Sequence, residues 1–169
     1  KLRAEDGRSI KQADISMFIN DLPNGKNTRT FCTEDASGST SQAANVIESM
    51  EAGAKALLID EDTSATNFMI RDELMQRVIH REMEPITPFI ERIRELYEQY
   101  DISTVIVAGS SGAYFHIADT IVQMDKYVPK EITDPAKREA ENFPALSGPE
   151  EPAGHPRFER RPRQSRGFG

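Results

Sequence analysis

Three carboxylates, Asp60, Glu61 and Asp62, follow directly on a short apolar run at residues 56–59. The run has the length and the β-branched content of a buried parallel strand. Carboxylates clustered at the end of such a strand repel one another and need a cation or a proton to coexist. A nucleoside-triphosphatase uses a strand that ends in Asp-Glu to hold magnesium with the Asp and to orient the attacking water with the Glu. The alternative interpretation is a strand that runs into an acidic loop.

A cluster of small and hydroxyl-bearing residues at 36–43 precedes this strand and lies at the start of a predicted helix. Free backbone N–H groups and the positive end of the helix dipole make such a helix start an anion site, and phosphate is the anion that we expect. The alternative interpretation is a capping cluster with a flexible approach loop. The spacing from Ser37 to Asp60 accommodates one loop, one helix and the return strand, so both motifs can lie near the same end of a sheet.

Predicted helices and strands alternate around these two motifs. Helical spacing of apolar residues predicts helices at 14–20, 40–52, 67–81, 88–100 and, as a short one, 113–118. Strands are expected at 1–8 as an edge strand, 56–59, 104–108 and 120–124. In the 67–81 helix, Met69, Ile70, Leu74 and Val78 form one apolar face. The alternation predicts an α/β fold in which helices cover a parallel sheet.

Length and composition restrict the class of protein. A chain of 169 residues with 37% apolar residues and a formal net charge of −7 is expected to form one domain of ordinary size. No apolar run is long enough to cross a bilayer and no signal-peptide pattern is present, so we expect a soluble, cytoplasmic protein without a membrane partner. Cys32 is the only cysteine, which leaves no internal disulfide. The three histidines lie far apart and lack metal-ligand spacing.

The carboxyl-terminal part of the chain differs in composition from the rest. Residues 130–154 are rich in Pro and Glu and are interpreted as a linker that leaves room for one short helix at 135–142. Residues 155–169 combine Arg, Pro and Gly without an apolar period, so this tail is predicted to be disordered. The folded domain is therefore expected to span residues 1–129.

The two motifs resemble those of a known family. Leu57-Leu-Ile-Asp-Glu-Asp-Thr-Ser-Ala-Thr-Asn67 is similar to the Walker B strand and D-loop of ATP-binding-cassette ATPases, usually Leu-Asp-Glu-Pro-Thr-Ser-Ala-Leu-Asp. Ser37-Gly-Ser-Thr-Ser-Gln42 is similar to the signature loop of that family, Ser-Gly-Gly-Gln-x-Gln. With two further stretches, Ala4-Glu-Asp-Gly-Arg-Ser9 and Asp14-Ile-Ser-Met-Phe-Ile-Asn20, the chain resembles the stand-alone "predicted ATPase of the ABC class" group. The resemblance covers about residues 2–129 and implies part of the parallel-sheet core of a P-loop (ABC/RecA-like) ATPase.

The resemblance also implies roles for the residues that match family motifs. Asp60 would hold Mg2+ through water, and Glu61 would polarise the attacking water as the general base. The signature loop would act in trans on an ATP held by the other subunit of a head-to-tail homodimer. Ser111 or its neighbour Ser110 would supply a γ-phosphate contact. The residues expected to contact ATP or to form the composite site are Ser37, Gly38, Ser39, Thr40, Gln42, Asp62, Ser64 and Asn67.

Three features depart from the family pattern. The phosphate-binding loop, Gly-x-x-x-x-Gly-Lys-Ser/Thr, is absent from the sequence, as is the Gln loop that follows it in the family. Both belong upstream of Lys1, so we expect the chain to be the C-terminal half of an ATPase domain and to be inactive alone. Gly109 stands where the family has its switch His, which removes an imidazole from that position. The segment 67–100 is longer than its counterpart in a transporter ATPase.

Two classes of function remain open from the sequence. The first is an ATPase domain that binds ATP and Mg2+ as part of a homodimeric machine. The second is an RNA-binding or other nucleic-acid-binding protein in which nucleotide binding is regulatory or lost, because arginines alternate with Phe158 and Phe168 in the tail. The side chains expected to contact RNA phosphates are Arg157, Arg160, Arg161, Arg163 and Arg166.

Overall fold

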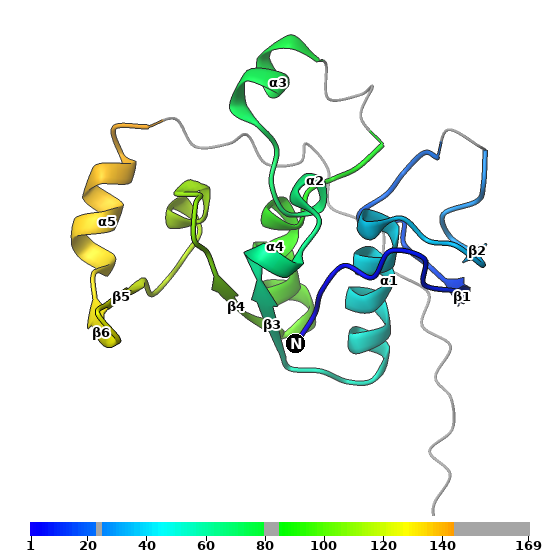
Figure 1. Ribbon diagram of the computed structural model, residues 1–169, viewed down its shortest axis with the longest axis horizontal. Coiled ribbons are helices and arrows are strands. Elements are labelled where there is room, and N and C mark those ends of the chain that lie inside the picture. Colours follow the sequence, from blue (N-terminus) through cyan, green and yellow to red (C-terminus); the bar gives the residue numbers. More distant parts are fainter. Residues whose placement is uncertain (23–24, 80–84, 144–169) are drawn as a thin grey trace, which may run out of the picture.

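A parallel pair of strands lies at the centre of the fold (Figure 1). The computed structural model describes residues 1–22, 25–79 and 85–143. Strand β3 spans Ala56–Asp60 and strand β4 spans Ser103–Val107, and their register places Asp60 opposite Val107. The crossover between them ends in helix α4, Phe89–Tyr100. The strands predicted at 56–59 and 104–108 and the helix predicted at 88–100 are therefore confirmed.

Helix α1, Gly38–Glu51, is the helix predicted at 40–52. Ser37 caps it, because its hydroxyl accepts a hydrogen bond from the Thr40 amide at 3.3 Å. Gly53 follows with φ of +82°, a left-handed conformation that favours glycine and ends the helix. The helix packs against β1 and α2 and places its apolar residues in the core; those with no exposed surface are Ala43, Ala44, Val46 and Ile47.

The hydrophobic core lies on one face of the strand pair. Phe18, Phe68 and Phe89 are fully buried, and their ring centroids lie 5.1 to 6.0 Å apart. Burial of each ring stabilises the fold by on the order of 2 kcal/mol, and the three rings join parts of the chain that are distant in sequence. On the opposite face, side chains more than half exposed are Leu58, Val105 and Val107. Within the described ranges, the core therefore covers one face of the parallel pair.

The amino-terminal part differs from the sequence prediction. Strands β1, Ile10–Ala13, and β2, Phe31–Thr33, form an antiparallel pair that the sequence did not indicate. The prediction of a helix at 14–20 is wrong. Asp14 accepts hydrogen bonds from the amide and the hydroxyl of Ser16, at 3.1 and 2.6 Å, and this local bonding favours a turn over a helix.

Residues 1–8 run beside β3 without forming the predicted edge strand. They make a single parallel bridge between Leu2 and Ile59, and the Leu2 amide donates to the Leu58 carbonyl at 2.8 Å. The Ala4 amide donates to the Thr63 carbonyl at 2.9 Å. These bonds hold the segment against the carboxyl end of β3.

The prediction of a single helix at 67–81 is also wrong. Two short helices stand there, α2 at Thr66–Met69 and α3 at Glu73–Val78, while residues 80 and 81 lie outside the described residues. Asp72 interrupts the helix because its carboxylate accepts a hydrogen bond from the Met75 amide at 3.0 Å and so caps α3. Leu74 and Val78, predicted to share one apolar face with Met69, are 69% and 71% exposed, whereas Met69 is buried.

The carboxyl-terminal elements form a separate hairpin and helix (Figure 1). Strand β5, Val122–Asp125, pairs antiparallel with β6, Val128–Glu131, so the strand predicted at 120–124 does not join β3 and β4. The short 3-10 helix η3, Ala113–His116, precedes the hairpin, and helix α5, Thr133–Ala140, follows it. Both short helices were predicted.

The observed fold is a mixed α/β arrangement with a small parallel sheet of two strands in the described ranges. A larger parallel sheet remains a prediction. β6 and α5 lie at or within the segment 130–154 that was interpreted as a linker. Residues 144–169, which include the Arg-rich tail, lie outside the described residues. The domain boundary at 129 stays a prediction.

Candidate active site

Asp60 is the last residue of β3 and forms one half of the candidate site. Its Oδ2 lies 2.9 Å from Lys1 Nζ, and its Oδ1 accepts a hydrogen bond from the Asp62 amide at 3.3 Å. The hydrogen bond from Lys1, together with the charge of that ammonium, holds the pKa of Asp60 below its usual range. Asp60 therefore remains a carboxylate at neutral pH.

Glu61 begins a 3-10 turn, η1, which spans Glu61–Thr63. Its Oε2 accepts hydrogen bonds from two backbone amides of the loop after β4, those of Gly109 at 2.9 Å and Ser110 at 3.2 Å. The register explains this contact: because Asp60 lies opposite Val107, the residues that follow the two strands meet at the same edge. The two amides fix the direction of the Glu61 carboxylate.

Asp60 is also the residue that could hold a divalent cation. Mg2+ is commonly bound by one or two carboxylates together with waters and substrate phosphates. An ionised carboxylate whose side chain is 28% exposed, at the end of a strand, fits that donor set. Among the described residues, no group of three or more His, Cys, Asp or Glu could hold a metal by itself. The site therefore fits a cation shared with phosphate and not one enclosed by protein ligands.

The predicted phosphate loop forms the first turn of α1. The hydroxyl of Ser37 lies 2.9 Å from that of Thr40 and 3.5 Å from that of Ser39. Gly38 lies against the segment after β3, because a Cβ at this position would lie 3.5 Å from the Cβ of Ala65. The structure therefore brings the two sequence motifs into contact.

Gln42 joins α1 to the segment 60–67. Its Oε1 accepts a hydrogen bond from the Ala65 amide, and its Nε2 donates to the Ser64 hydroxyl, both at 2.9 Å. Ser64 in turn donates to the Asp60 carbonyl at 2.9 Å. Gln42 has no exposed surface, so a direct contact with nucleotide would require it to leave these bonds.

Other predicted site residues lie at the edges of this arrangement. Asp62 and Asn67 are exposed. The hydroxyl of Ser111 accepts a hydrogen bond from the Ala113 amide at 3.2 Å, so it supports the start of η3. The catalytic role of Ser111 and the nucleotide contacts of Asp62 and Asn67 stay predictions.

Several partners of the two carboxylates were missed at the sequence level. Lys1 beside Asp60 had no signal in the sequence. The amides of Gly109 and Ser110 could have been located, since polar residues that follow adjacent parallel strands meet at one edge. Tyr114 in η3 is 6% exposed, and its burial, with a smaller contribution from the Glu61 charge, raises its pKa to about 12. Its position in a predicted short helix gave no indication of this.

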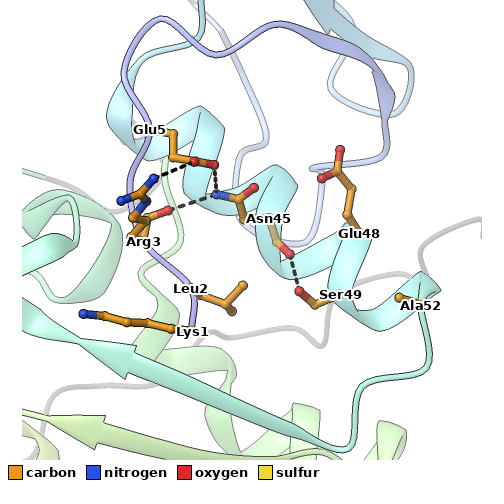
Figure 2. Close-up of a pocket in the computed structure, with 8 residues that line it drawn as sticks. All are labelled: Lys1, Leu2, Arg3, Glu5, Asn45, Glu48, Ser49 and Ala52. Atoms are coloured by element: carbon orange, nitrogen blue, oxygen red, sulfur yellow. Dashed lines mark hydrogen bonds and ion pairs between the residues drawn. The ribbon is translucent and has the colours of Figure 1, made fainter.

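A pocket of about 290 Å3 lies between residues 1–5 and α1 (Figure 2). The Asn45 amide donates to the Arg3 carbonyl at 3.0 Å and to Glu5 at 3.1 Å, and Arg3 pairs with Glu5 at 3.4 Å. The pocket is lined by Lys1, Leu2, Arg3, Glu5, Asn45, Glu48, Ser49 and Ala52. None of the predicted site residues lines it, so it forms no part of the candidate site.

Two further expectations concern membranes and RNA. Across residues 1–22, 25–79 and 85–143, no helix has both the length and the apolar character that crossing a membrane requires. The five arginines expected to bind RNA lie outside the described residues. RNA binding therefore stays a prediction.

Comparison with known proteins agrees with the motifs. A family model described as ABC_ATPase: P-loop domain matches residues 1–159. No curated protein matches the chain. The matched range includes the first turn of α1, the end of β3 and the loop after β4.

Proposed function

The chain belongs to the ABC_ATPase P-loop domain family, and from that premise we propose that Asp60 and Glu61 form the hydrolytic centre of a Mg2+-dependent ATPase. One observation carries the proposal: at the carboxyl end of a parallel strand pair, the Glu61 carboxylate accepts two backbone hydrogen bonds from the loop after β4. Ligands of open parallel sheets bind at this end of the strands. A carboxylate held in one direction beside a second, ionised carboxylate suits a general base beside a metal ligand.

Each carboxylate has a separate role in this proposal. Glu61 orients the attacking water and accepts its proton. Both amides bond Oε2, and among the described residues no donor bonds Oε1, so Oε1 faces the water. Asp60 holds Mg2+, which polarises the phosphoryl oxygens when bound.

The first turn of α1 contributes to a second site in this proposal. By the family resemblance, the free N–H groups near Ser37 face the γ-phosphate of an ATP bound to the other subunit of a head-to-tail homodimer. Gln42 connects that turn to the segment 60–67, so the γ-phosphate contact and the hydrolytic centre are joined through direct hydrogen bonds. By the family resemblance, the ATP phosphates would be held by a Gly-x-x-x-x-Gly-Lys-Ser/Thr loop, a pattern that these 169 residues lack.

The substitution Glu61→Gln in the full-length protein tests the hydrolytic role. ATP hydrolysis is expected to fall by about a hundredfold or more, because the amide cannot accept the proton of the attacking water. ATP affinity, measured by calorimetry, is expected to remain unchanged. Glu98→Gln is the matched control, since Glu98 is exposed on α4. Equal turnover in Glu61→Gln and the parent protein would remove Glu61 from the mechanism.

The substitution Ser37→Arg tests the role of α1 in trans. A large side chain at the first turn is expected to abolish ATP-dependent dimerisation while each subunit still binds nucleotide. Loss of the cap alone costs about 1 kcal/mol of helix stability and does not affect assembly specifically. Sedimentation with ATP in a Glu61→Gln background, which traps the dimer, separates the two effects. If the double variant Ser37→Arg/Glu61→Gln dimerised as well as Glu61→Gln alone, Ser37 would act only as a helix cap.

A further inference from the structure

Tyr114 carries a buried hydroxyl that the fold alone does not explain. The residue lies in η3, is 6% exposed, and its hydroxyl has no hydrogen-bond partner in the described part of the chain. Buried polar groups in folded proteins are almost always bonded, because an unmet donor is costly. The buried phenol therefore has a donor that none of the described residues uses, and that donor is available to an acceptor beside it.

The surroundings of Tyr114 identify that acceptor. The loop that leads into Tyr114 already contacts Glu61 through the amides of Gly109 and Ser110, and the charge of Glu61 adds to the effect of burial on the phenol. Burial and this charge together raise the pKa of Tyr114 to about 12, so the hydroxyl keeps its proton at neutral pH and serves as a donor. Glu61 is an acceptor already oriented toward the same loop by two amides.

The chain connects the phenol firmly to those two amides. Tyr114 follows Ser110 by four positions, and the intervening loop is closed by hydrogen bonds of its own. The Ser111 hydroxyl accepts from the Ala113 amide at 3.2 Å, and the Phe115 amide donates to the Gly112 carbonyl at 3.0 Å. One short segment, residues 109–114, thus provides both amides on Glu61 and the buried phenol.

We propose that Tyr114 is a positioning residue for Glu61, whose hydroxyl donates a hydrogen bond to Oε1 of the carboxylate in the hydrolysis-competent state. This inference rests on the proposed role of Glu61 as general base. A carboxylate oxygen has two lone pairs, so Oε1 accepts the phenol through one and faces the attacking water with the other. Three donors, two amides on Oε2 and one phenol on Oε1, then fix the carboxylate in direction and in tilt.

A packing role makes the opposite prediction for the same residue. If the ring of Tyr114 only fills space, Tyr114→Phe removes an unmet donor and keeps the ring, so hydrolysis is unaffected and stability is equal or higher. If the hydroxyl positions Glu61, the same substitution lowers turnover and loosens the carboxylate. Tyr127→Phe is the matched control, because Tyr127 is 98% exposed in the β5–β6 turn.

Two measurements on the full-length protein test the proposal. Steady-state hydrolysis of Tyr114→Phe is expected to show kcat lowered about tenfold with KM for ATP within about twofold, the scale of one hydrogen bond to a charged group. Amide hydrogen exchange at Gly109 and Ser110, resolved by NMR, is expected to become severalfold faster, because their common acceptor is less well held. Tyr127→Phe is expected to change neither quantity.

The two measurements also separate the failure of this inference from that of the proposed function. Unchanged kcat together with unchanged exchange in Tyr114→Phe would overturn the positioning role. If Glu61→Gln left hydrolysis at the parental rate, the proposed function would fail. The exchange measurement alone would then show whether the Tyr114 hydroxyl bonds the Glu61 carboxylate. Faster exchange at Gly109 and Ser110 would support this bond, and unchanged exchange would overturn it.

Discussion

Two contacts hold the segment 60–67, and they are made by different parts of the chain. On the inner side, the fully buried side-chain amide of Gln42 from α1 bonds this segment twice, at Ser64 and at Ala65. On the outer side, the backbone amides of Gly109 and Ser110 bond Glu61 near the surface. We call these the inner contact and the outer contact.

The two contacts are expected to have different roles, one in the stability of the fold and the other in catalysis. The inner contact depends on one fully buried side chain that makes both hydrogen bonds, so its replacement removes both at once and is costly to the fold. The outer contact depends on amides that every residue except proline provides, and water can replace it at the surface. We therefore expect changes to the inner contact to affect folding, and changes to the outer contact to affect the direction of Glu61.

The largest effect on stability is expected for Gln42→Leu. This substitution roughly keeps the size of the side chain but leaves the Ala65 amide without its acceptor, while the Ser64 hydroxyl keeps only its bond to the Asp60 carbonyl. The free energy of unfolding is expected to fall by about 2 kcal/mol, the scale of a buried unmet donor. Urea unfolding of the variant measures this loss.

Gln12→Leu serves as the control for the inner contact. Gln12 is exposed in β1, so its replacement is expected to change the free energy of unfolding by no more than about 0.5 kcal/mol. Equal urea midpoints for Gln42→Leu and Gln12→Leu would show that the inner contact contributes nothing specific to the fold.

A smaller effect, on turnover and not on folding, is expected for Gly109→Pro. Proline removes one of the two amide donors to Glu61, and ATP hydrolysis by the full-length protein is expected to fall about tenfold, the scale of one hydrogen bond to a charged group. Gly109→Ala keeps the amide, and its Cβ would meet open space, so it is expected to retain the parental rate. Equal rates for the two variants would mean that the amide does not orient Glu61.

Elements that carry their own end signals were predictable from sequence. Hydroxyl residues near Ser37 and a glycine at Gly53 delimit α1, and the prediction lies within two residues of the observed bounds. The apolar runs of β3 and β4 likewise indicated strands, because their length and β-branched content are typical of strands. The placement of Asp60 and Glu61 at the end of β3 followed directly from that prediction.

Elements that depend on contacts between distant residues were not predictable in the same way. The segment 14–20 has helical spacing, yet local bonding of Asp14 to Ser16 and burial of Phe18 against other rings make it a turn. Asp72 divides the helix expected at 67–81, because its carboxylate caps α3. From the sequence alone, a capping Asp inside an apolar period cannot be distinguished from an Asp on the exposed face of a continuous helix. The edge at which the outer contact lies follows from the two predicted parallel strands, but which backbone amides bond Glu61 depends on the register between them.

The most direct test of the account is single-turnover ATP hydrolysis by the full-length protein in a double-mutant cycle of Gly109→Pro and Glu61→Gln. If the loop after β4 acts by orienting the Glu61 carboxylate, Gly109→Pro lowers the rate about tenfold in the parent protein, which is the scale of one hydrogen bond to a charged group. In the Glu61→Gln background, the same substitution then lowers the rate by less than about twofold. If Gly109→Pro lowers the rate by the same factor in both backgrounds, the loop acts independently of Glu61 and the central claim is contradicted.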